Sequence, residues 1–135
     1  MNAPAWLLPP KPKRLLLLLG ILLAILAGEK VYRIWRPTHT HVTEHYSIRS
    51  SALPAQSKET GDKVEALYAT YADTFKTWPE LRQPHGKLQL KLFKDRNEFR
   101  RCNRGLGWAE AFYRAPCCHA YYSANELNPH HWMLH

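Results

Sequence analysis

Glycine-rich phosphate loops and cysteine pairs with C-x2-C spacing are both lacking in this chain of 135 residues. Its most glycine-rich segment, RGLG (104–107), has neither the six-residue glycine span nor the lysine with which a P-loop grips phosphate. The three cysteines, Cys102, Cys117 and Cys118, contain no C-x2-C spacing. The sequence therefore argues against a P-loop nucleotide site and against a zinc site built from cysteines.

Acidic side chains are also scarce, with 11 against 19 lysines and arginines, so the net charge is +8. Residues 1–36 carry +5 of this charge, which leaves +3 for the other 99 residues. Most of the excess thus flanks the N-terminal hydrophobic run, where basic residues act as topology signals. No basic stripe stands out in the remainder, so we expect no nucleic-acid partner.

The one long hydrophobic run is LLLLLGILLAILAG (15–28), which follows KPKR. A basic segment before about 14 apolar residues is typical of a secretory signal peptide, whereas a membrane span usually needs about 20. Cleavage after Ala27 or Gly28 would place Ile25 or Leu26 at the −3 position, where a small residue is required. We therefore favour an uncleaved signal anchor over a cleaved signal peptide, and expect a single-pass membrane protein whose domain is extracytoplasmic.

The sequence divides into an anchor (residues 1–36), a polar linker (37–44) and an α+β domain (45–135). In an exported domain, the odd number of cysteines suggests one disulfide from Cys102 to either Cys117 or Cys118. Three free thiols are the alternative.

Hydrophobic periodicity predicts the elements of the domain. Residues 45–53 and the alternating KLQLKLF (87–93) predict strands. Between them, apolar residues at helical spacing predict a long amphipathic helix that ends at Pro79; they are Val64, Leu67, Tyr68, Tyr71, Phe75 and Trp78.

Three shorter elements follow that helix and strand. Residues 95–102 predict a short helix with Asp95 as N-cap and Glu98 in a capping box. WAEAFYR (108–114) and CHAYYS (118–123) predict a β-hairpin around Ala115–Pro116. Asn128 and Pro129 predict the N-cap and first residue of a final helix. The sequence contains barely two turns of this helix.

Four segments together resemble a known family: KLQLKLFKDRNEFRRC (87–102), RGLGWAEAFY (104–113), CCHAYYS (117–123) and NPHHWMLH (128–135). They are similar to a bacterial group of uncharacterised, membrane-tethered proteins with a gluzincin-like (peptidase MA-like) domain. In that group, a segment like the last one runs directly into H-E-x-x-H, and His135 aligns with the first histidine.

The resemblance implies an incomplete gluzincin-like domain and a zinc metallopeptidase in the complete protein. In H-E-x-x-H the two histidines bind one zinc and the glutamate deprotonates the metal-bound water, while gluzincins take a third ligand from the next helix. The glutamate and the other ligands would follow His135, so we expect this chain alone to be inactive and to bind zinc weakly. Peptides or proteins would be the substrates of the complete enzyme, and Tyr121 and Tyr122 are candidates for its substrate cleft.

Several other interpretations remain open at this stage. His131 and His135 are spaced i, i+4 and form an alternative two-histidine metal face, although zinc sites usually need three or four ligands. Glu110 is expected to be a solvated strand residue rather than a catalytic one. The alternative to a peptidase is a non-catalytic, membrane-tethered binding or structural module.

Overall fold

The computed structural model describes residues 12–78 and 86–134. Compactness divides the chain into two units, Met1–Ile34 and Trp35–His135. The second unit is a mixed α/β domain built on one five-stranded sheet. It begins ten residues earlier than the sequence predicts. Pro79, which is expected to end the long helix, lies outside the described residues.

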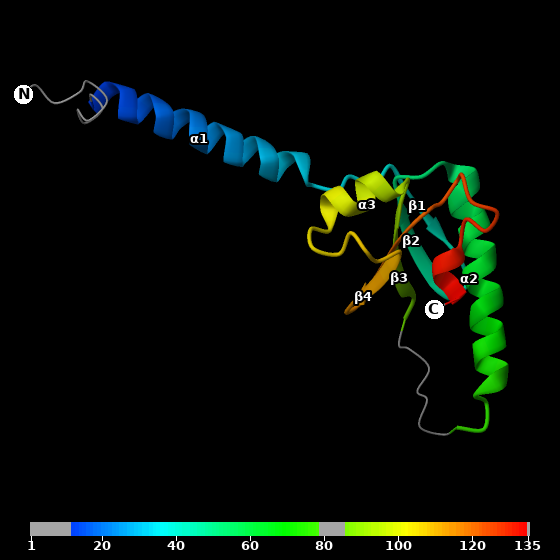
Figure 1. Cartoon of the computed structure of the whole chain (residues 1–135). Helices are drawn as coiled ribbons and strands as arrows, with labels where there is room; N and C mark the ends of the chain where they lie inside the picture. The colour runs from blue at the N-terminus through cyan, green and yellow to red at the C-terminus, as the bar shows by residue number, and fades with distance from the viewer. Residues whose placement is uncertain (1–11, 79–85, 135) are drawn as a thin grey trace, which may run out of the picture. The chain divides into compact units, whose positions relative to one another are not determined.

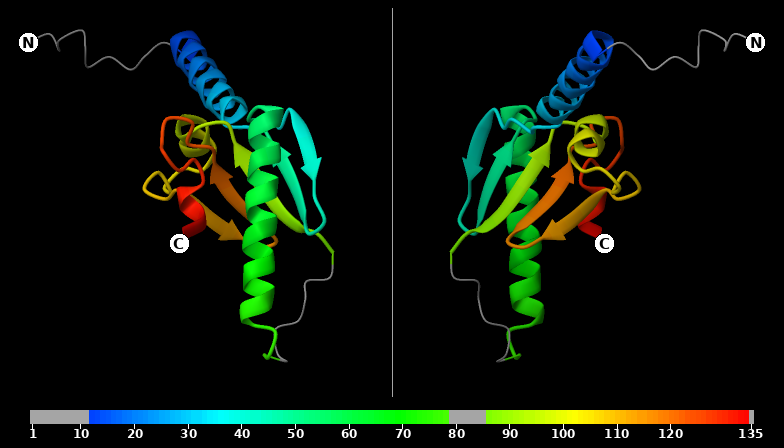
Figure 2. Two further views of the ribbon diagram at one scale, coloured as in Figure 1. Left: turned by 90° about the vertical axis from the view of Figure 1, so that its right-hand side faces the viewer. Right: turned by 90° about the vertical axis from the view of Figure 1, so that its left-hand side faces the viewer.

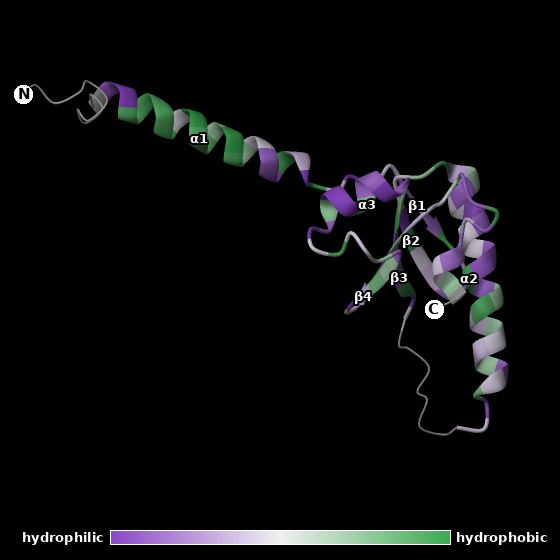
Figure 3. Cartoon of the chain, viewed as in Figure 1, coloured by the Kyte–Doolittle hydropathy of each residue, from purple (hydrophilic) through white to green (hydrophobic). Residues whose placement is uncertain are grey.

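The described part of the first unit contains one helix, α1 (Pro12–Tyr32), whose residues 13–32 are long and apolar enough to cross a membrane. At 1.5 Å per residue, these 20 residues extend about 30 Å, which matches the hydrocarbon thickness of a bilayer. Hydrophobic residues occupy most of its ribbon between the hydrophilic residues near its two ends (Figure 3). The helix is longer than the 14-residue run because it also includes the basic residues on both flanks.

The sheet has the strand order β1-β2-β3-β5-β4. Its strands are β1 (His39–Val42), β2 (Tyr46–Ser50), β3 (Leu88–Phe93), β4 (Ala111–Arg114) and β5 (Cys117–Tyr121). The three central strands run parallel, and both edge strands, β1 and β4, pair antiparallel with their neighbours. The predicted strands at 45–53 and 87–93 are confirmed, and so is the hairpin around Ala115–Pro116.

Helix α2 (Pro54–Thr74) crosses one face of this sheet, and the opposite face is turned away from it (Figures 1 and 2). The core beneath α2 contains apolar side chains from three strands, together with Val64 of the helix itself; the strand residues are Ile48, Leu90, Leu92 and Ala120. On the other face, Phe93, Phe99 and Tyr121 form a smaller aromatic cluster. Period-2 alternation along each strand assigns neighbouring side chains to these two faces.

The predicted linker is wrong, because residues 39–42 of it form strand β1. Side chains alternate there as well: His39 and His41 are half-buried, whereas Thr40 and Val42 are exposed. The His39 ring lies 2.9 Å from the Ser57 hydroxyl of α2. Hydrophobic alternation does not indicate this strand, because its inward side chains are histidines, which pack against a helix.

The apolar stripe of α2 is divided between two environments. The buried residues of the helix are Ser57, Thr60, Gly61 and Val64, of which only Val64 belongs to the predicted stripe. Leu67, Tyr71 and Trp78 remain about half exposed or more. The second half of α2 extends past the strands (Figure 2), which accounts for the exposure of this part of the helix.

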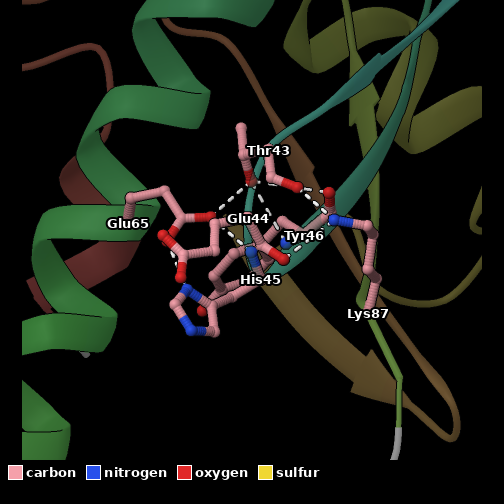
Figure 4. A network of polar contacts seen from close by, with 6 residues as sticks. All are labelled: Thr43, Glu44, His45, Tyr46, Glu65 and Lys87. Carbon is pink, nitrogen blue, oxygen red and sulfur yellow. Dashed lines mark hydrogen bonds and ion pairs between the residues drawn. The ribbon is translucent and has the colours of Figure 1, made fainter.

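Glu65 of α2 fastens the turn between β1 and β2 (Figure 4). Its carboxylate accepts hydrogen bonds from the hydroxyl of Thr43 and from both the backbone N–H and the ring of His45, the latter two at 2.7 Å. Partial burial alone would raise the pKa of Glu65, but these hydrogen bonds lower it to about 2. Lys87 donates to the carbonyls of Thr43 and Glu44 and so joins the start of β3 to the same turn.

The short helix α3 (Arg96–Cys102) begins as predicted, with the Asp95 side chain accepting from the backbone N–H of Glu98. The reciprocal half of the capping box is displaced by one residue. The Glu98 carboxylate accepts from the backbone N–H of Lys94 and from the Ser51 hydroxyl, not from the Asp95 backbone. The cap therefore also attaches α3 to the loop that follows β2.

The final helix differs from the α-helix that the sequence predicts. Residues His131–Leu134 form a single 3-10 turn, η2. Asn128 holds the residues before this turn, because its side-chain oxygen accepts a hydrogen bond from the backbone N–H of His130 at 3.1 Å. Trp132 and Met133 pack against the core on the α2 side of the sheet.

Candidate functional site

A groove of about 700 Å³ lies between the edge strand β4, the turn η2 and the middle of α2. Its walls are largely apolar and aromatic; they include Leu67, Trp108, Tyr113, Cys118, Trp132 and Met133. Trp108 and Tyr113 are among the most exposed aromatic residues of the described chain. The Nε1 donor of Trp132 is buried and finds no acceptor in the part of the chain that the structure describes.

One polar pair marks the wall of this groove. The Nδ1 atom of His131 lies 2.7 Å from the Glu110 carboxylate, and this hydrogen bond raises the pKa of His131. Both side chains are partly exposed, so the pair is in contact with solvent. Glu110 is partly solvated, as expected, but it precedes β4 instead of lying in a strand, and it bonds to a histidine 21 residues away.

The neighbouring histidine, His130, attaches the C-terminal segment to α2. It is buried, and its Nε2 atom lies 3.0 Å from the Thr60 hydroxyl. Burial lowers the pKa of His130, which favours the neutral ring. Glu59 completes the contact, because it accepts a 2.8 Å hydrogen bond from the Tyr122 hydroxyl. The segment after β5 is therefore held in place by specific polar contacts.

Tyr121 and Tyr122, the candidate cleft residues, are both buried and lie in the two different cores. Neither contributes to the groove beside β4. They border a smaller hollow of about 230 Å³ near the start of α3. Burial raises the pKa of Tyr121, and the hydrogen bond to Glu59 raises the pKa of Tyr122. Both phenols are thus kept neutral and are used in packing.

The metal-ligand candidate His135 lies outside the described residues. Within residues 12–78 and 86–134, no three His, Cys, Asp or Glu side chains gather closely enough to hold a metal ion. The pairing of His131 with His135 requires α-helical geometry, in which residues four apart share a face. The described residues of this segment form the 3-10 turn η2 instead of an α-helix, and the pairing stays a prediction because His135 lies outside them.

The three cysteines are free thiols, in contrast to the expected disulfide from Cys102. Strand alternation explains the difference for Cys118, which packs with the core beneath α2, whereas Cys102 packs with the aromatic cluster on the opposite face. Cys117 is the first residue of β5. It lies about 13 Å along the strand from Tyr121, the residue of β5 that belongs to the same aromatic cluster as Cys102. Disulfide-bonded residues need Cα atoms within about 7 Å.

Sequence reasoning missed a row of charged side chains on the face of the sheet turned away from α2. Cross-strand pairing places Arg49 beside Lys91 and Lys91 beside His119. Arg114 of β4 lies on the same face, two residues from Phe112, which pairs with His119. These residues are scattered over 65 positions of the sequence, so only the strand register could have brought them together.

Comparisons with known proteins yield no match, either to a family model or to a curated protein. The chemistry of the groove and of the charged row therefore rests on the geometry described above.

Proposed function

We propose that the chain is the membrane-anchored N-terminal part of a zinc metallopeptidase, in which the groove beside β4 receives the peptide substrate. In this proposal α1 is the anchor, the mixed α/β domain provides the substrate side of the cleft, and zinc is bound through His135 and residues that follow it. The domain lies outside the cytoplasm.

The observation that carries the proposal is the position of the groove. The resemblance of the C-terminal segments to gluzincin-like proteins implies a hairpin beside a cleft, directly before the metal-binding helix. Strand β4 belongs to such a hairpin, borders the groove and is followed by the segment that carries the C-terminal histidines. One edge of β4 has no partner strand among the described residues. An extended peptide adds readily to such an edge, because its backbone supplies the missing hydrogen bonds.

The described residues would bind and orient a peptide in this groove. Tyr113 and Trp132 offer aromatic walls for apolar side chains. Glu110 and His131 fix the relative position of the two groove walls. Because no three metal-ligating side chains gather among the described residues, we assign no catalytic step to them.

Zinc binding tests the proposal. We expect the 135-residue chain to bind no zinc tightly, whereas a chain extended through the following reading frame binds about one zinc ion per molecule. His135→Ala should abolish that binding in the extended chain. His131→Ala is the matched control, since it removes a histidine of the same segment whose Nδ1 already contacts Glu110, and it should leave the zinc content unchanged.

Two results would contradict the peptidase proposal. One is a following reading frame without E-x-x-H. The other is tight, stoichiometric zinc in the 135-residue chain, which would assign the metal to residues within this chain instead.

A non-catalytic binding module is the second candidate, and the largely apolar lining of the groove favours it. Such a module would retain the groove and the edge strand without chemistry. An extended chain that binds a peptide through the groove, loses that binding in Trp132→Ala and neither holds zinc nor cleaves the peptide would establish this alternative.

A further inference from the structure

The face of the sheet turned away from α2 (Figure 2, right) carries three cations, Arg49, Lys91 and Arg114. Arg49 and Lys91 are direct cross-strand neighbours on adjacent strands, which are about 4.8 Å apart. Arg114 adds a third cation from the edge strand. Like charges placed opposite each other destabilise a sheet. The stability of the fold therefore does not explain why these cations are neighbours.

These three cations form no ion pair with any carboxylate of the described chain. Lysines elsewhere do find partners, as in Lys58 with Asp62 and Lys76 with Asp73. His119 in the middle of the row is only 7% exposed, and its Nδ1 atom has no hydrogen-bond partner among the described residues. Burial and the three neighbouring cations lower the pKa of His119 to about 4, so its ring is neutral at pH 7 and the excess charge belongs to the cations.

Aromatic rings accompany the cations on this face. Lys91 Nζ lies 5.8 Å from the centroid of the Trp35 ring, and the Arg114 guanidinium lies 5.7 Å from that of Phe112. The Trp35 ring packs on Phe93, while its Nε1 donates to the Ser51 hydroxyl. Arginine and lysine bind phosphate groups, and tryptophan is enriched at the headgroup level of membranes.

The chain itself limits the distance between this face and a membrane. Helix α1 ends at Tyr32, and Trp35 follows three residues later. Three residues span at most about 11 Å, so Trp35 remains within reach of the lipid surface from which α1 emerges. An acidic polypeptide would also suit the charge, but nothing in the chain keeps one close by.

We propose that the sheet face carrying Arg49, Lys91 and Arg114 binds the anionic phospholipid headgroups of the membrane in which α1 is anchored, with Trp35 at the interface. The inference rests on the anchoring role proposed for α1 and is independent of the peptidase proposal. It gives the tethered domain a preferred face toward the lipid, which leaves the groove on the α2 side of the sheet accessible to solvent.

Lysine acetylation of the full chain in nanodiscs tests this proposal. Discs of phosphatidylcholine alone are compared with discs that also contain phosphatidylglycerol, and the modification rates of individual lysines are read by mass spectrometry. Lys91 should react about fivefold more slowly in the anionic discs, and added salt should remove the difference. Lys58 of α2, which is 68% exposed, is the internal control and should react equally in both discs.

Two variants assign the effect to the charged row. Arg49→Gln/Arg114→Gln should abolish the protection of Lys91. Lys63→Gln/Lys76→Gln removes the same amount of charge from α2 and the turn after it, leaves the control residue Lys58 in place, and should preserve the protection. Circular dichroism verifies folding, and the single variant Arg114→Gln at the sheet edge replaces the double variant if the latter unfolds.

Equal reactivity of Lys91 in both kinds of disc would overturn the proposal while leaving the anchor intact. Failure of the chain to enter discs at all would overturn it together with the anchor. Protection of Lys91 by soluble polyglutamate, without protection by phosphatidylglycerol, would assign the face to an acidic polypeptide instead.

Discussion

Glu65 shows how one carboxylate positions a turn at a distance in the sequence. It is a quarter exposed, yet three hydrogen bonds from Thr43 and His45 favour its ionised form. Because the folded pKa is about 2 and the ordinary value is 4.5, the stabilisation is fully present above pH 4.5 and is lost as the pH falls toward 2.

We expect Glu65→Gln to lower the free energy of unfolding by about 2 kcal/mol at pH 7. The difference from the native chain should shrink steadily between pH 5 and pH 2, as measured by denaturant unfolding of the detergent-solubilised chain. Glu44→Gln, which removes an exposed carboxylate from the same turn, is the control and should change stability little at any pH. A deficit in Glu65→Gln that is independent of pH would refute the assigned role of the carboxylate.

The cysteines give a second prediction at this scale. Thiol titration of the denatured chain under non-reducing conditions should find three free thiols. In the folded chain, Cys118 should be alkylated more slowly than Cys102, because burial raises the pKa of Cys118 to about 11 and leaves little thiolate to react. Recovery of one thiol per chain would restore the disulfide that the odd cysteine count suggests.

At the scale of elements, the contact between α2 and β1 depends on the absence of a side chain at Gly61. A Cβ atom there would lie 2.9 Å from the His41 ring and 2.9 Å from the Thr43 methyl group. Replacing glycine by alanine within a helix normally stabilises it by about 1 kcal/mol. Gly61→Ala should instead destabilise the domain by about 1–3 kcal/mol, because the ring and the methyl group must move.

Ala69→Gly, at an exposed position of the same helix, is the matched control for Gly61→Ala. It should cost about 1 kcal/mol through helix propensity alone. Denaturant unfolding of both variants measures the two effects. Stabilisation by Gly61→Ala would show that β1 does not rest against this part of α2.

The strands and the hairpin could be predicted because Leu88, Leu90 and Leu92 alternate with polar residues and Pro116 marks the turn. Strand β1 could not, because its inward residues, His39 and His41, acquire their burial from α2 alone. The apolar stripe of α2 predicts more burial than the structure shows. Periodicity identifies an apolar face of the helix, but the length of the sheet decides how much of that face is covered.

The candidate site was predictable only in its location near the C-terminal segment. The sequence indicates His131 as a candidate metal ligand, but its partner Glu110 is 21 residues away and joins it only through the folding of β4 and β5. The row of Arg49, Lys91 and Arg114 likewise depends on strand order. No local pattern encodes contacts between strands that a helix separates in the sequence.

At the scale of the whole molecule, α1 is long and apolar enough to hold the chain in a membrane. We expect the expressed chain to retain its N-terminus and to remain with membranes after alkaline carbonate washing. Leu19→Arg/Leu22→Arg should release it, since each arginine at the centre of a span costs about 3 kcal/mol. Leu67→Arg, which changes an exposed leucine of α2, should leave it membrane-bound. A soluble product that begins near Gly28 or Glu29 would identify α1 as a cleaved signal peptide.

The parallel pairing of β3 also determines when the domain can form during synthesis. Ile48 pairs with Leu90 and Leu90 with Cys118, so the two central pairings join residues 42 and 28 positions apart. A nascent chain that already holds α1, β2 and α2 has no partner for β2 except the short hairpin strand β1. The sheet must wait for β3, and then for β5, to leave the ribosome. Because long-range pairing is slow, the chain spends this interval with unpaired strands, and chaperone demand should peak before residue 121 emerges.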